Sequence, residues 1–82
     1  MAQNITETLL KRSVKDKRVR LAEKLYELRQ DNNLSQARLA EIAGVDRKTI
    51  NRIENGHFSP ALDTIVRLCV ALGVNPSEML KG

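Results

Sequence analysis

A short segment around residues 47–55 carries basic and amide side chains at helical spacing. Ile50 and Ile53 are three residues apart and therefore share one face of a helix. The opposite face presents groups suited to the major groove of DNA, where arginine or lysine pairs with guanine and asparagine with adenine. The alternative is a solvated helix face that only keeps the domain soluble. The candidate base-contacting residues are Arg47, Lys48, Asn51 and Arg52.

Two short helices must position this segment. Ser35 is a favourable N-cap for a helix over residues 36–43, and Gly44 is its stop signal. Asp46 caps a second helix over residues 47–54. The connection between them is too short for anything but a tight turn, which predicts a helix-turn-helix.

Apolar spacing predicts further helices on both sides of this pair. One runs from about residue 16 to residue 30, and another is opened by Ser59 with Pro60 and ended by Gly73. Asn75 caps a short last helix. No segment alternates with period two over a useful length, so the predicted fold class is all-α.

Two charged residues fall on apolar faces. Arg29 lies on the leucine stripe of the first long helix, and Glu54 lies beside Ile50 and Ile53. Charges directed at a small core are unfavourable unless they pair. We expect a structural ion pair between Arg29 and Glu54, whereas the alternative is two side chains that reach water separately.

The net charge of +4 is concentrated at the N-terminus. Residues 1–20 contain six basic and two acidic residues, and the remainder is balanced. This favours an anionic partner but does not choose among nucleic acid, a membrane surface and an acidic protein. One cysteine and one histidine allow no internal disulfide and no plausible metal cluster. We expect no enzyme, catalytic residue, metal or cofactor, no membrane partner, and a reducing cytoplasmic setting.

The run L-S-Q-A-R-L-A-E-I-A-G-V-D-R-K-T-I-N-R-I-E-N-G, with A-L-G-V further on, resembles the lambda-repressor/Cro-like (XRE) family. The resemblance covers about residues 20–80. It implies a compact five-helix lambda-repressor-like fold, dimeric binding to a near-palindromic operator, and transcriptional control. Arg38 departs from the pattern, because the family often has an acidic residue there.

The resemblance also implies roles for individual residues. Arg47, Lys48 and Arg52 match base-contacting positions, and Arg29 with Glu54 matches an Arg–Glu pair of the family. Asn51 matches a neighbouring position that contacts bases or phosphates. The free N–H groups at the start of the helix over residues 36–43 favour a phosphate. The candidate phosphate-contacting residues are Ser35, Gln36, Thr49 and Asn55.

Residues 1–18 fall outside the family pattern and are predicted to be a basic, partly helical extension of a helix-turn-helix domain over residues 19–82. They permit three interpretations: a mobile tail, a helix packing on a partner subunit, or a basic arm touching phosphates. The spacing of Ile5, Leu9 and Leu10 favours a helix over residues 5–13 that contributes to dimerisation, with a secondary electrostatic part in DNA binding.

The function expected is a homodimeric double-stranded-DNA-binding transcriptional regulator of the repressor type, located with the nucleoid in the cytoplasm. Its dimer interface is predicted on the broad apolar arc of the helix that ends at Gly73, together with the terminal S-E-M-L segment. The alternative is an antitoxin that binds a toxin protein and autoregulates its promoter, with residues 1–18 covering the toxin. A coactivator that bridges proteins is disfavoured by the basic arc.

Overall fold

The first helix is the longest element of the structure. The computed structural model describes residues 2–81, and α1 (Ala2–Asp31) runs through 30 residues without interruption. The two helical segments predicted here are therefore one, and the predicted start near residue 16 is wrong. The physical reason is that residues 2–31 contain no glycine or proline, so nothing interrupts the helix between the two predicted segments. Residues 1 and 82, the outer limits of the two predicted domains, lie outside the described residues.

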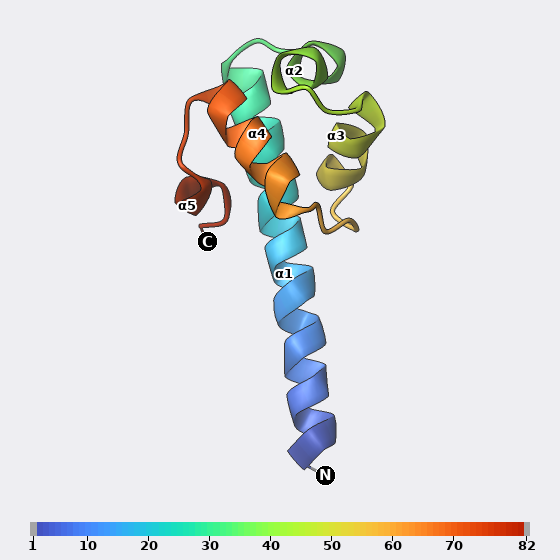
Figure 1. Cartoon of the computed structure of the whole chain (residues 1–82). Coiled ribbons are helices and arrows are strands. Elements are labelled where there is room, and N and C mark those ends of the chain that lie inside the picture. The colour runs from blue at the N-terminus through green and yellow to red at the C-terminus, as the bar shows by residue number, and fades with distance from the viewer. Residues whose placement is uncertain (1, 82) are drawn as a thin grey trace.

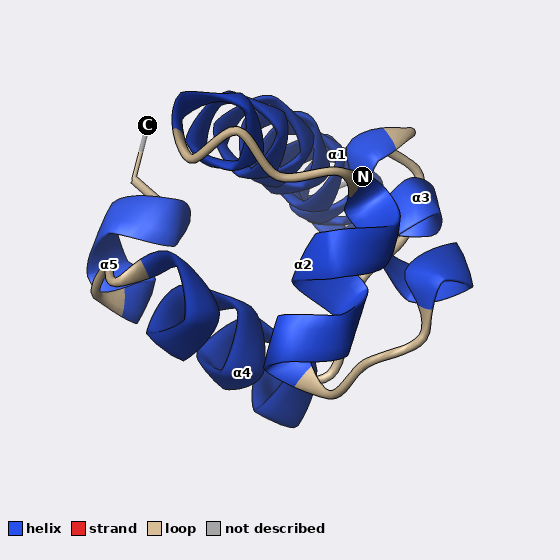
Figure 2. Ribbon diagram, turned by 90° about the horizontal axis from the view of Figure 1, so that it is seen from above, coloured by secondary structure: helices blue, strands red, loops and turns tan. Residues whose placement is uncertain are grey.

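Four shorter helices complete the fold: α2 (Gln36–Ala43), α3 (Arg47–Glu54), α4 (Leu62–Leu72) and α5 (Pro76–Met79). Seen from above, they gather with the C-terminal half of α1 around a common interior (Figure 2). The N-terminal half of α1 projects from this body (Figure 1), and the molecule measures 48 × 22 × 19 Å. The described residues contain no strand, which confirms the all-α, five-helix fold class with a helical N-terminal extension.

The bounds of α2 and α3 coincide with the ranges predicted from their caps. The Ser35 hydroxyl accepts a hydrogen bond of 3.0 Å from the Arg38 backbone N–H, which closes the first turn of α2. The Asp46 carboxylate accepts one of 2.8 Å from the Lys48 N–H in the same way. Gly44 ends α2 with a φ of 69°, a left-handed conformation that favours glycine.

The start of α4 differs from the prediction. Ser59 and Pro60 lie before the helix, which begins only at Leu62 after an extended Ala61. The Ser59 hydroxyl accepts a hydrogen bond of 2.7 Å from Arg18 Nε of α1. The side chain of Ser59, which was expected to open α4, therefore bonds to α1 instead. The predicted opening of this helix at Ser59 and Pro60 is therefore wrong.

The predicted C-terminus of α4 and the predicted N-terminus of α5 agree with the structure. Gly73 ends α4 with a φ of 71°, and Asn75 occupies the N-cap position of α5. The Asn75 side chain forms no capping hydrogen bond there; its backbone carbonyl instead accepts the N–H of Glu78 at 2.9 Å.

The core lies where α1, α2, α3 and α4 meet, with α5 closing one end. Burial raises the pKa of the Cys69 thiol, which lies fully inside this core. None of the helices described is long and apolar enough to cross a membrane. The largest fully buried side chains are Leu25, Leu39, Ile50, Ile53, Leu68, Cys69 and Met79.

Only one side of α4 is covered by the body. Leu68, Cys69 and Leu72 are buried, but Leu62, Val66 and Val70 remain exposed. The three exposed residues follow one another at intervals of four positions and therefore form one stripe along the helix. We call this the α4 stripe.

Candidate nucleic-acid interface

The outward face of α3 holds the predicted base-contacting residues together. Ile50 and Ile53 are buried and fix the inner side of the helix. All four outward residues are exposed and line one shallow depression of about 320 Å³. Three cations around an amide give this depression donors that match guanine and adenine edges. Its lining residues are Arg47, Lys48, Asn51 and Arg52.

A buried ion pair ties the C-terminal end of α3 to α1. Arg29 Nε and Nη2 donate to the two carboxylate oxygens of Glu54 at 2.8 and 2.9 Å, a bidentate arrangement. Arg29 Nη1 donates to the Leu34 carbonyl at 2.8 Å, and its guanidinium lies 5.4 Å from the Tyr26 ring centroid. The hydrogen bond to Glu54 is the main cause that raises the pKa of Arg29, against the lowering effect of burial.

Gln36 connects this ion pair to the outward face. Its Nε2 donates to Glu54 Oε1 at 3.1 Å, and its Oε1 accepts from Asn51 Nδ2 at 3.4 Å. Asn55 Nδ2 in turn donates to Asn51 Oδ1 at 3.3 Å. The sequence does not predict this chain of contacts, and from sequence Gln36 is expected only to bind a phosphate. No local signal predicts it, because Gln36 and Glu54 meet only where α2 packs on α3.

The predicted phosphate-contacting residues are spread over two places. Ser35 and Gln36 lie at the N-terminus of α2, where the first backbone N–H groups have no acceptor within the helix. Thr49 is half-buried, and it lies outside the α3 depression, as does Asn55. Gln36 and Asn55 instead line a second hollow, of about 460 Å³, between α1 and the end of α3.

Arg38, the residue that departs from the family pattern, forms an ion pair on the surface of α2. Its guanidinium pairs with Glu41 one turn further on, and both side chains are largely exposed.

In the described part of the chain, no group of three or more His, Cys, Asp and Glu side chains could hold a metal ion.

A helix-turn-helix with a basic, solvent-facing second helix defines a class of DNA-binding protein. The Helix-turn-helix family model (HTH_3) matches residues 25–79. The chain therefore belongs to this XRE-type helix-turn-helix family of DNA-binding transcriptional regulators.

Two individual relatives each match over about two thirds or more of this chain. The chain is 40% identical over 55 residues to the HTH-type transcriptional regulator PuuR of Escherichia coli, a match that spans 67% of this chain but only 30% of PuuR. It is 38% identical over 60 residues to the control protein C.SmaI of Serratia marcescens, covering 73% of this chain and 71% of that protein.

Solved structures show the same fold. The restriction-modification controller protein C.AhdI from Aeromonas hydrophila matches with a TM-score of 0.72 and 35% identity, over 76% of this chain and 94% of C.AhdI. The hypothetical transcription factor NHTF from Neisseria matches with a TM-score of 0.76 and 31% identity, over 82% of this chain and 77% of NHTF.

Proposed function

We propose that this chain reads a specific sequence of double-stranded DNA as a homodimer on a near-palindromic operator and acts as a repressor by occupying that site. The observation that carries the proposal is the exposed basic depression on α3. Its location would be the nucleoid in the cytoplasm. The residues proposed to contact bases are Arg47, Lys48, Asn51 and Arg52.

The remaining contacts position α3, the proposed recognition helix, on the DNA. The N-terminus of α2 is a natural phosphate site, because its N–H groups and helix dipole favour an anion. The Ser35 hydroxyl oxygen already caps the helix, so its proton is the group offered to a phosphate. We propose that the Arg29–Glu54 pair sets the angle at which α3 enters the groove. The residues proposed to contact phosphates are Ser35, Gln36, Thr49 and Asn55.

The α4 stripe supports the homodimer. Leu62 and Val70 are 70% and 76% exposed, and Val66 is 41% exposed, so a row of apolar side chains faces solvent in the single chain. Contiguous apolar surface of this kind marks an interaction site. A two-fold dimer places two recognition helices about 34 Å apart on one face of the DNA. The similarity to C.AhdI, named as a restriction-modification controller, also supports a regulatory role.

Selection of bound duplexes from a random pool tests this proposal. A symmetric selected site is expected. Arg47→Ala, Lys48→Ala and Arg52→Ala are then compared with Lys81→Ala, which removes an exposed charge far from α3 in sequence. Loss of a base contact should relax preference at one position and weaken binding by about 1–3 kcal/mol. If all three α3 variants bind the selected site like the wild type, α3 does not read the DNA.

A further inference from the structure

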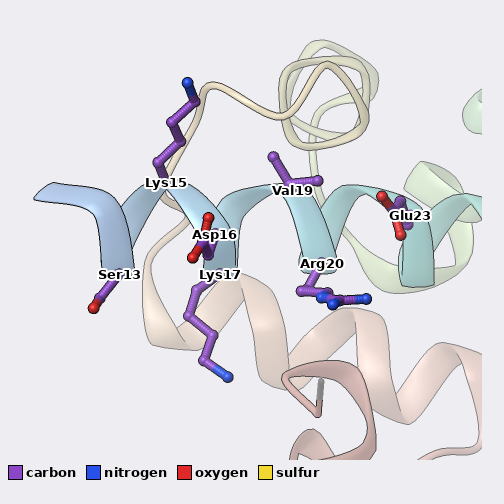
Figure 3. Close-up of a pocket in the computed structure, with 7 residues that line it drawn as sticks. All are labelled: Ser13, Lys15, Asp16, Lys17, Val19, Arg20 and Glu23. Atoms are coloured by element: carbon purple, nitrogen blue, oxygen red, sulfur yellow. The ribbon is translucent and has the colours of Figure 1, made fainter. Parts of the chain in front are cut away.

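The projecting half of α1 carries a row of cations that the helix-turn-helix does not explain. Lys11, Lys15 and Arg18 are four and three residues apart, which places them on one face of the helix. We call this row the basic ridge. Lys17 and Arg20 lie outside this row, and Figure 3 shows Lys15 projecting from one side of α1 while Lys17 and Arg20 project from the other.

Two contacts show where the basic ridge faces. Arg18 Nε donates to Ser59 Oγ at 2.7 Å. Ala22, one turn further along the same face, lies beside Gly56, where an added Cβ would come within 3.9 Å of the Ala22 Cβ. Gly56 and Ser59 both belong to the loop that follows α3. The ridge therefore continues, beyond the body, the face of α1 that is turned toward the end of the recognition helix.

The cations of the basic ridge are available to an anionic partner outside the chain. Neither Lys11 nor Lys15 forms an ion pair in the described part of the structure. Lys11 lies seven residues from Arg18, which is about 10 Å along the helix axis. Duplex DNA presents one negative charge about every 1.7 Å of its axis, so a row of this length faces several phosphates.

We propose that the basic ridge binds backbone phosphates of the DNA that flanks the sequence read by α3. This rests on the proposed function, because the ridge and the α3 depression must then contact the same duplex. Phosphate contacts of this kind carry no sequence information and add affinity that falls with salt. Leu10 and Val14 point elsewhere, along the face that continues the core stripe to Leu21, so the ridge does not compete with apolar packing.

The test compares two variants of the full chain that remove the same charge. The ridge variant is Lys11→Gln with Lys15→Gln, and the control is Lys17→Gln with Arg20→Gln. Glutamine has nearly the helix propensity of lysine and arginine, so α1 is retained, as circular dichroism can verify. Dissociation constants are measured for the selected site and for a random duplex over a range of salt concentrations, and dimerisation is measured without DNA.

The ridge variant should bind both duplexes more weakly by the same factor. Its plot of log affinity against log salt should be shallower by about 2 per bound subunit, at about 0.9 for each lost contact. Between about 50 and 200 mM salt, the wild type should therefore lose about tenfold more affinity per subunit than the ridge variant. The control should keep the wild-type slope.

Three results overturn the inference. Equal slopes for the ridge and control variants mean that the ridge touches no phosphates. A changed base preference in the ridge variant means that the ridge contacts bases instead. A changed dimerisation constant with an unchanged slope means that the ridge takes part in subunit packing. A wild-type protein without any sequence preference refutes the proposed function itself, and that is known before any variant is compared.

Discussion

The ion pair between Arg29 and Glu54 is the contact whose removal should most disturb the helix-turn-helix. Replacing either residue by leucine leaves the other charged and buried, since the two side chains are only 9% and 8% exposed. Breaking one partner of a buried pair is destabilising by about 3–5 kcal/mol. For 82 residues the whole stability is of the order of 4–12 kcal/mol, so each single variant should lose a large part of it.

The contacts around the pair refine these values. Arg29→Leu also removes the donor to the Leu34 carbonyl, whereas Glu54→Leu leaves Arg29 bonded to that carbonyl. We therefore expect losses of about 4 and about 3 kcal/mol, respectively. The double variant should lose only about 2–3 kcal/mol, because no buried charge remains and the residual loss comes from the Leu34 carbonyl and the Gln36 amide. The coupling energy is then about 4–5 kcal/mol.

Urea denaturation followed by circular dichroism measures these free energies of unfolding. Protein concentration is held constant, because a dimer is more stable at higher concentration. If Glu54→Leu does not fold, Glu54→Gln keeps the shape and one acceptor and should be destabilised less. DNA affinity of the folded double variant then reports whether α3 keeps its angle.

The same chain provides a control pair on its surface. Arg38 and Glu41 form an ion pair with side chains 58% and 72% exposed. A double-mutant cycle there should give a coupling of about 1 kcal/mol or less. If the Arg29–Glu54 cycle is additive within about 0.5 kcal/mol, as distant sites are, the argument for a stabilising buried pair is refuted.

Four further outcomes are expected. Gly73→Ala should lower the free energy of unfolding by about 1–2 kcal/mol through its positive φ alone, since nothing lies within 4 Å of the added Cβ. Gly44→Ala should lose more, because its Cβ would also lie 3.0 Å from Arg67 Nη1; equal losses in denaturation would show that Arg67 moves freely. Ser35→Ala should cost about 1 kcal/mol of stability and weaken binding to all duplexes alike, and an unchanged stability would contradict the cap. Val70→Asp should raise the dimer dissociation constant in sedimentation equilibrium without unfolding the chain, and an unaffected dimer would place the interface elsewhere.

The two helices of the helix-turn-helix could be predicted from sequence to the residue. Their bounds depend on hydrogen bonds between near neighbours, such as Ser35 with Arg38 and Asp46 with Lys48. A backbone turn at Gly44 is equally local, because glycine has no Cβ and adopts the left-handed φ without strain. Spacing along α3 also separates the buried Ile50 from the outward face, so the candidate base-contacting residues follow from the same periodicity.

Tertiary contacts decided what local patterns could not. Ser59 was expected to help open α4, but its hydroxyl partner is Arg18, 41 residues away, and α4 begins later. Gln36 bridges Glu54 and Asn51 only because α2 packs on α3. The direction of the basic ridge likewise depends on α1 lying against the loop after α3. Sequence neighbours determine where a helix begins and ends, whereas the partner of a side chain is determined by which helices the core brings together.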